Sequence, residues 1–315
     1  NLGPSGLEFV LSAVDSCRAS KISELDLSYN VFGEEGAAML AATLPRLVNL
    51  RVLILKGNAL GPAGMSVVAA GLPAVQNTLK HLDLATNGLC AAGVAHLELA
   101  SLQLESLSLR GSWLCQEGVG VLLQVIRPMS SNLISLDIGQ NKLNAEGVAE
   151  LLEDLPAMPH LLSFNLSENS FATAGFSPRC FARLTERCPL LEHLNLNANR
   201  IGHDADILHD LFSLMPRSLL SLNVGVAQFT TPVLSTIFEA LPVLPKLEML
   251  SLVQTRLDDD ALFVLASSIP TKMASLQTID LSGNSVTSHA AKKLEDDLRH
   301  GLGNFKQVRF TKRCR

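Results

Sequence analysis

The chain has 315 residues, of which 47% are hydrophobic but only 4% aromatic, and its formal net charge is −5. A mildly acidic chain lacks the dense basic surface of a dedicated nucleic-acid binder, so the composition disfavours nucleic acid as a partner. No apolar run reaches the roughly 18 residues that a membrane-spanning helix needs, and the six cysteines show no paired spacing, so we expect reduced core thiols in a cytoplasmic or nuclear protein.

The most regular feature of the sequence is a stretch of the form Leu-x-Leu-x-x-Asn that recurs along the whole chain. Its last position, which we call the Asn column, is occupied by Asn30, Asn58, Asn87, Ser112, Asn141, Asn169, Asn199, Ala227, Thr255 and Asn284. The intervals between them are 28, 29, 25, 29, 28, 30, 28, 28 and 29 residues. Such a period predicts stacked repeats with one continuous core, so we expect a single repeat domain over residues 1–315.

In chain order, residues 1–7 match the internal stretch 59–65, so we expect the chain to open partway through a repeat and to belong to a longer protein. Each later unit starts with alternating apolar residues, as in 53–55, which predicts a short strand. A turn and a helical pattern follow, as in 144–155. Prolines are expected to end these helices, namely Pro45, Pro73, Pro128, Pro156, Pro216, Pro242 and Pro270. The stretch 305–310 predicts a last strand.

The alternation of strand and helix also predicts how the units are arranged. Strands that re-enter in the same direction after each helix must be parallel, and such crossovers are right-handed. Neighbouring strands lie about 4.8 Å apart, whereas packed helices need about 8–10 Å, so the helical side must be the longer. We therefore expect an α/β fold, a right-handed solenoid shaped as a horseshoe, with a parallel β-sheet on the concave face and helices on the convex face. It would hold about ten repeats plus partial repeats at both ends.

The stretches 25–37 and 136–148 read LDLSYNVFGEEGA and LDIGQNKLNAEGV, and they resemble the repeats of leucine-rich repeat proteins of the ribonuclease-inhibitor-like class. The resemblance implies that each Asn of the column is buried under the turn and bonds the backbone of adjacent coils. It leaves the function open, because the class includes inhibitors, the Ran GTPase-activating protein, sensor modules of NACHT-domain immune receptors and scaffolds.

Three repeats depart from the Asn column. The hydroxyls of Ser112 and Thr255 are expected to replace part of the amide, whereas Ala227 can replace none of it. We therefore expect repeat eight to be irregular, either as a tolerated defect or as a contact site or hinge. The acidic run 258–260 is expected to cap a helix, and the His- and Asp-rich run 203–210 is interpreted as a solvated face rather than a metal site.

The only tryptophan, Trp113, lies in the shortest repeat at a position expected to be exposed. With Arg110, Gln140 and Lys142 it forms our leading candidate for a protein contact, because Trp and Arg dominate interface energetics. The alternative is that Trp113 folds inward to fill a vacancy in the short repeat. Further candidates are residues of the strands and of a second, more apolar patch: Lys56, His81, Asp83, Asp137, Met249 and Val253.

The sequence contains no phosphate-binding Gly-rich loop, no Gly-x-Ser-x-Gly elbow and no His-Glu-x-x-His helix. We therefore expect no catalytic, cofactor-binding or metal-binding residues. The favoured function is a non-enzymatic scaffold that binds a protein partner through its concave face and adjacent loops. A sensor module of a NACHT-type immune receptor and a GTPase-activating protein are the alternatives, and the oligomeric state stays open.

Overall fold

The structure is a computed structural model that describes residues 2–16, 21–173, 176–201, 205–227, 229 and 231–311. Its contacts divide the chain into two compact units. Unit 1 comprises residues 1–143 and 154–161, and unit 2 comprises residues 144–153 and 162–315. The continuity of the two units as one domain stays a prediction.

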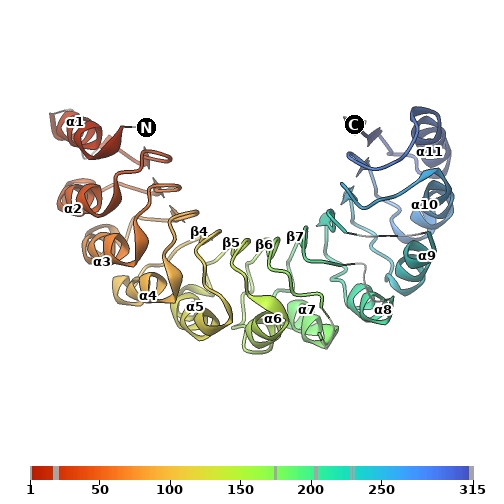
Figure 1. Ribbon diagram of the computed structural model, residues 1–315, viewed down its shortest axis with the longest axis horizontal. Coiled ribbons are helices and arrows are strands. Elements are labelled where there is room, and N and C mark those ends of the chain that lie inside the picture. The colour runs from red at the N-terminus through yellow and green to blue at the C-terminus, as the bar shows by residue number, and fades with distance from the viewer. Residues whose placement is uncertain are drawn as a thin grey trace. The chain divides into compact units, whose positions relative to one another are not determined.

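Unit 1 alternates short strands with helices (Figure 1). Its strands are β1 (Glu24–Asp26), β2 (Val52–Ile54), β3 (His81–Asp83), β4 (Ser106–Ser108) and β5 (Ser135–Asp137). Its α-helices are α1 (Gly3–Ser16), α2 (Gly33–Thr43), α3 (Gly61–Gly71), α4 (Cys90–Ala95) and α5 (Val119–Ile126). The amide of Gly3 donates to the Asn30 carbonyl at 3.0 Å, as Gly61 does to Asn87, which confirms that the opening residues match an internal repeat.

Unit 2 repeats the same alternation. Its strands are β6 (Ser163–Asn165), β7 (His193–Asn195), β8 (Ser221–Asn223), β9 (Met249–Ser251), β10 (Thr278–Asp280) and β11 (Gln307–Arg309). Its α-helices are α6 (Asn144–Glu153), α7 (Ala182–Arg187), α8 (Ala205–Ser213), α9 (Thr231–Ala240), α10 (Asp259–Lys272) and α11 (Ser288–Gly301). The last strand falls within the stretch predicted for it.

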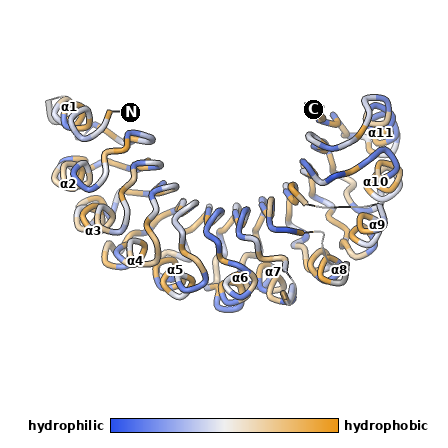
Figure 2. The backbone as a smooth tube through the Cα atoms, in the orientation of Figure 1, coloured by the Kyte–Doolittle hydropathy of each residue, from blue (hydrophilic) through white to orange (hydrophobic). Residues whose placement is uncertain are grey.

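All strands pair in parallel within each unit, and equivalent repeat positions lie side by side. Leu53 pairs with Leu25 on one side and with Leu82 on the other, and all three side chains are buried. Hydrophobic and hydrophilic stretches alternate along each coil (Figure 2). The strands line one side of each unit and the helices the other, so the predicted α/β solenoid is confirmed.

Prolines end the helices at most of the predicted positions. The helices α2, α3 and α5 stop two residues before Pro45, Pro73 and Pro128, each of which lies in a short 3₁₀ turn. The prediction is wrong at Pro270, which lies inside α10. A proline removes one N–H donor, and α10 continues for only two residues beyond it, so few hydrogen bonds are disturbed.

None of the described helices is both long and apolar enough to cross a membrane.

The Asn column joins successive coils by hydrogen bonds, as the resemblance implied. Asn87 is 3% exposed, and its Nδ2 donates to the carbonyls of Leu55 in the preceding coil and Leu84 in its own coil at 2.9 and 3.0 Å. Its Oδ1 accepts from the Asn58 amide at 2.9 Å. One side chain therefore satisfies orphaned backbone groups of two coils, which is a structural task rather than a catalytic one.

The two hydroxyl residues of this column behave differently. The Oγ1 of Thr255 donates to the Leu252 carbonyl at 2.7 Å and contacts the Asn284 Oδ1 at 3.2 Å, so the expected partial replacement is confirmed there. The Oγ of Ser112 is buried without a hydrogen-bond partner among the described residues, so the expectation is wrong for Ser112. Threonine is β-branched, which restricts its χ1, whereas the serine hydroxyl has no methyl group to fix its direction.

Repeat eight is irregular, as expected, in the part of it that the structure describes. The amide of Phe229 donates to the Thr255 carbonyl at 2.9 Å. In repeats two, four and nine the residue at this position donates to the Oδ1 of the next Asn, as Leu257 does to Asn284 at 3.1 Å. Thr255 offers no amide oxygen, so the bond moves to its backbone. Gln228 and Thr230 lie outside the described residues.

The described cysteines are all free thiols, but they lie in two environments. Cys180 and Cys188 are buried, and burial raises the pKa of each thiol to about 12. Cys90 and Cys115 are half-buried, Cys90 as the first residue of α4 and Cys115 just before the 3₁₀ turn that leads into α5, so the expectation of core thiols is wrong for this pair. Cys17 and Cys314 lie outside the described residues.

The hydrogen bonds of the Asn column predict different losses of stability for two substitutions that each remove a hydroxyl group. Thr255→Val should lower the free energy of unfolding by about 1 kcal/mol, because it removes a buried hydrogen bond. Ser112→Ala should change it by less than about 0.5 kcal/mol, because its hydroxyl has no partner to lose. Urea unfolding of both variants measures the difference, and equal losses at the two positions would contradict the assignment.

The two thiol environments predict selective alkylation of the folded protein. The raised pKa keeps Cys180 and Cys188 protonated at pH 8, and the thiolate is the reactive form, so both should resist iodoacetamide while Cys90 and Cys115 react. Peptide mapping by mass spectrometry after timed exposure measures each rate, and the same treatment in denaturant is the control. Equal rates at Cys180 and Cys90 in the folded protein would show that burial does not protect the former.

Candidate functional site

The loops after the strands hold residues in a left-handed backbone conformation on both sides of the Asn column. Gln140 and Lys142 flank Asn141 with φ of +56° and +57°, and Trp113 follows Ser112 with φ of +59°. Side chains other than those of glycine rarely adopt this conformation, and for a bulky residue it costs free energy. Repeat three places Gly88 at the position of Trp113.

Trp113 is 56% exposed and packs along the outside of its loop. The Lys142 Nζ lies 5.5 Å from the centre of its ring, within the range of a cation–π contact. A Cβ built on Gly88 would lie 3.8 Å from the Trp113 Cζ3, so the ring reaches back over the preceding repeat. The alternative in which Trp113 folds inward is wrong, because more than half of its side chain is exposed. The short repeat is accommodated instead by the short helix α4 and the 3₁₀ turn η4 (His96–Ala100).

A hollow of about 590 Å³ lies beside Trp113, and we call it the Trp113 hollow. It is lined by Ala59, Gly61, Thr86, Asn87, Gly88, Gly111, Trp113, Gln140 and Lys142, all of unit 1. Many of these residues are small, which leaves space beside the indole ring. The structure therefore brings together three of the predicted contact residues, Trp113, Gln140 and Lys142, around one concave surface.

Two other predicted residues from the loops, Arg110 and Lys56, do not line the hollow. Arg110 is half-buried in the turn two residues after β4 and three residues before Trp113. The Lys56 Nζ lies 5.4 Å from the centre of the Tyr29 ring. A side-chain hydrogen bond with Tyr29 is the largest cause that raises the Lys56 pKa. Tyr29 is 59% exposed and was not predicted. An aromatic side chain directly next to the Asn column was the sequence signal that could have identified Tyr29.

The acidic residues of the strands have a structural task that sequence reasoning missed. The Oδ1 atoms of Asp83 and Asp137 accept from the amides two residues on, those of Ala85 and Gly139, at 2.8 and 2.9 Å. In Asp26 the same arrangement with the hydroxyl and amide of Ser28 lowers the carboxyl pKa. These side chains hold the chain as it leaves the strand, which accounts for Asp or Asn in this column without a partner. His81 is exposed beside them.

The second predicted patch, in unit 2, is less prominent. Met249 and Val253 are half-buried on and after β9, and neither is among the strongly exposed apolar residues. A neutral polar groove of about 230 Å³ lies on the neighbouring strands β6, β7 and β8. Asn165, Asn195 and Asn223 line it, and each uses its Oδ1 to accept the amide two residues on.

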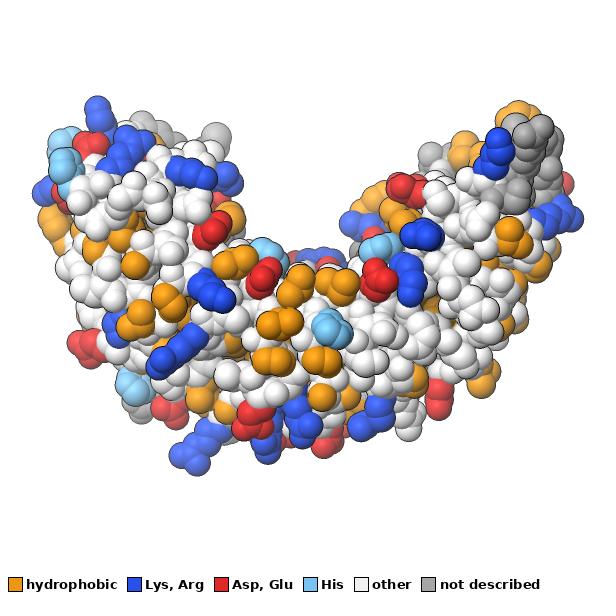
Figure 3. All heavy atoms as spheres, turned by 180° about the vertical axis from the view of Figure 1, so that it is seen from behind, with side chains coloured by type: hydrophobic (Ala, Val, Ile, Leu, Met, Phe, Trp, Pro, Cys, Tyr) orange, Lys and Arg blue, Asp and Glu red, His pale blue; other side chains and the backbone are white. Residues whose placement is uncertain are grey.

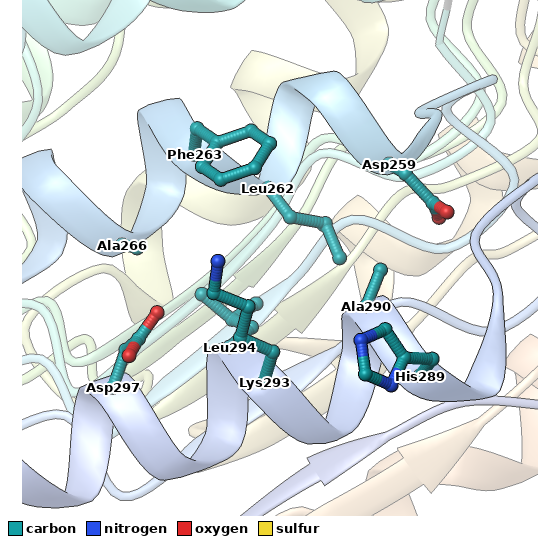
Figure 4. A pocket seen from close by; sticks show the side chains of 9 residues that line it. All are labelled: Asp259, Leu262, Phe263, Ala266, His289, Ala290, Lys293, Leu294 and Asp297. Carbon is teal, nitrogen blue, oxygen red and sulfur yellow. The ribbon is translucent and has the colours of Figure 1, made fainter.

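A further hollow of about 210 Å³ lies between α10 and α11 on the helical side of unit 2 (Figure 4). Leu262, Ala266 and Leu294 form its apolar floor, and Phe263 and Lys293 lie at its rim with the Lys293 Nζ 5.0 Å from the ring centre. Acidic and basic groups share this rim, so it carries no preference for one charge. The described residues contain no cluster of three or more His, Cys, Asp or Glu that could hold a metal, and His203 and Asp204 lie outside them.

Comparisons with known proteins agree with this architecture. A family model described as Leucine Rich repeat matches residues 19–41, 47–69 and 130–152. The chain is 33% identical over 221 residues to the Tonsoku-like protein of Bos taurus, and the matched region makes up 65% of the chain and 16% of that protein. It is 28% identical over 192 residues to the ribonuclease inhibitor of Mus musculus, which covers 60% of the chain and 42% of the inhibitor.

NACHT, LRR and PYD domains-containing protein 5 of Mus musculus is 28% identical over 172 residues, 54% of the chain and 14% of that protein. The chain thus spans less than half the length of each of these relatives. Among solved structures, the leucine-rich repeat-containing protein LegL7 of Legionella pneumophila superposes with a TM-score of 0.57 at 18% identity, covering 96% of this chain and 87% of LegL7. The repeats, the coil and these likenesses together show that the chain is a leucine-rich repeat protein of the ribonuclease-inhibitor-like class.

Proposed function

We propose that the chain is a non-enzymatic protein-interaction module whose main contact site is the Trp113 hollow. Leucine-rich repeats of this class support a role in protein interaction. The hollow adds a specific place for it, because interface energy concentrates in aromatic and cationic residues beside concave surfaces. The cytoplasm or nucleus remains the compartment that we infer from the scattered cysteines.

One observation carries this proposal: the only tryptophan of the chain is more than half exposed and lines a hollow bordered by small residues. Its left-handed backbone is shared by Val31, Lys142 and Arg256 at equivalent loop positions, so that conformation belongs to the coil. An exposed aromatic side chain contributes little to folding, and beside a hollow it is the type of residue that dominates interface energetics. Preformed loops on a rigid stack of coils also lose little conformational freedom on binding.

A sensor module of a NACHT-type receptor is the second candidate, favoured by the likeness to NACHT, LRR and PYD domains-containing protein 5. It is a special case of the same proposal, because a sensor module also binds its ligand or partner through exposed repeat surfaces. A Walker motif in the same gene product would favour it, because nucleotide binding in such receptors lies outside the repeats.

Trp113→Gly tests the contact role, because glycine adopts the same backbone conformation without strain. We expect the free energy of unfolding to change by less than about 0.5 kcal/mol, since the removed side chain is exposed. We expect affinity for a protein partner to fall by about 30-fold, the equivalent of about 2 kcal/mol for an interface hot spot. Quantitative affinity capture with mass spectrometry identifies the partners, and titration of each purified partner measures the loss.

Arg256→Gly is the matched control, because Arg256 occupies the equivalent loop position in unit 2 with φ of +62°. It should leave the captured partners unchanged. The proposed function fails if the wild-type chain captures no protein above background, or if Trp113→Gly captures the same partners with the same affinities. A large loss of stability in Trp113→Gly would instead return the residue to a structural role.

A further inference from the structure

The loops around the Trp113 hollow carry a charge opposite to that of the whole chain. Four equivalent stretches of unit 1, residues 56–59, 85–88, 110–113 and 139–142, contain Lys56, Arg110 and Lys142 and no acidic residue. The chain as a whole has a formal net charge of −5. On the face shown in Figure 3, basic and acidic side chains are interspersed. The loops of unit 1 are therefore a local basic strip.

The equivalent loops of unit 2 lack this combination. Residues 167–170, 197–200, 225–228, 253–256 and 282–285 contain Arg200 and Arg256, but also Glu168, and no aromatic residue. A repeat needs neither a cation nor an aromatic side chain at these positions in order to fold, because unit 2 builds the same coil without that pairing. The basic and aromatic character of the unit 1 loops is thus not a requirement of the coil.

The Lys142 ammonium group contacts the Trp113 ring and is also accessible to a ligand. The Lys142 side chain is exposed, and its Nζ contacts the Trp113 ring while no ion pair joins it to a described carboxylate. The nearest acidic column belongs to the strands, where Asp83 and Asp137 each hold a backbone amide. The ammonium group can therefore accept an anionic partner without first breaking a salt bridge.

We infer that the Trp113 hollow binds an acidic peptide segment of a protein partner, with an apolar side chain in the hollow and carboxylates against the basic strip. The inference rests on the proposed function and names the chemistry of the partner. The small residues Ala59 and Gly88 leave room beside the indole ring. Apolar contact with that ring and charge attraction to Lys142 select the same ligand.

Single-stranded nucleic acid is the competing ligand class, because it too combines negative charge with flat rings. One feature favours the peptide. Binding of single strands uses a series of aromatic platforms, whereas Trp113 is the only aromatic residue that lines the hollow.

The test uses Trp113 as its own probe, since no other tryptophan contributes to the fluorescence of the chain. The full chain is titrated with a synthetic peptide that has one leucine between runs of glutamate. The same leucine between runs of lysine, the glutamate peptide with alanine in place of leucine, and single-stranded oligothymidine are titrated in parallel. We expect the glutamate–leucine peptide to bind at least ten-fold more tightly than each of the others, and more weakly as salt rises.

Variants locate the site. Lys142→Glu and Ala59→Phe should each weaken the glutamate–leucine peptide at least ten-fold, the first by reversing a charge and the second by filling the hollow. Arg256→Glu is the control in unit 2 and should leave the affinity unchanged. We expect all three variants to fold, because each change is at an exposed loop residue. Melting curves check this expectation.

The inference is overturned if the lysine peptide or the oligothymidine binds more tightly, if no peptide binds, or if Lys142→Glu leaves the affinity unchanged. These results are distinguishable from failure of the proposed function. If Trp113→Gly still abolishes binding of a purified protein partner, the contact site stands and only the acidic character of the partner is wrong. If Trp113→Gly affects no partner either, both proposals fall.

Discussion

The interaction on which the structure depends is the hydrogen bonding of the Asn column between successive coils. A three-residue strand leaves backbone groups unpaired as soon as it ends, and a buried unpaired group costs free energy. Asn141 donates to the carbonyls of Leu109 and Ile138 and accepts from the amide of Ser112, so one side chain serves the turns of two coils. Stacking in register, and hence a shared core, follows from this bonding.

The same bonding explains why function can lie in the loops. Because the Asn holds the turn from inside, the residues on either side of it face outward and are released from packing. Trp113 and Gly88 occupy the same position in neighbouring repeats with the same left-handed backbone. The coil tolerates either, so the choice between them is available for recognition. The strand column has less freedom, because Asp83 and Asp137 hold the exit of their strands.

Irregular repeats show how far the bonding can be weakened. Thr255 keeps one hydrogen bond of the missing amide, Ser112 keeps none through its hydroxyl, and repeat eight shifts a bond to the backbone. In each case the strands on both sides keep their parallel register. Leucines packed across neighbouring coils therefore hold the register where the column fails, and a single departure changes the loop rather than the coil.

The sequence by itself determined the repeat, the parallel strands and the burial of the Asn column, because each is set by a period that local residues repeat. It also placed Trp113 on an exposed loop by its position after the column. Tertiary structure decided what lies beside it: the hollow exists because Ala59 and Gly88 from other coils, and Gly111 in the same loop, are small. It also decided that Ser112 has no partner, that the Asp83 carboxylate is already engaged, and that Pro270 lies within a helix. These outcomes depend on distances between residues 25 or more apart in the chain, or on a rotamer or helix end, and no pattern in the sequence specifies them.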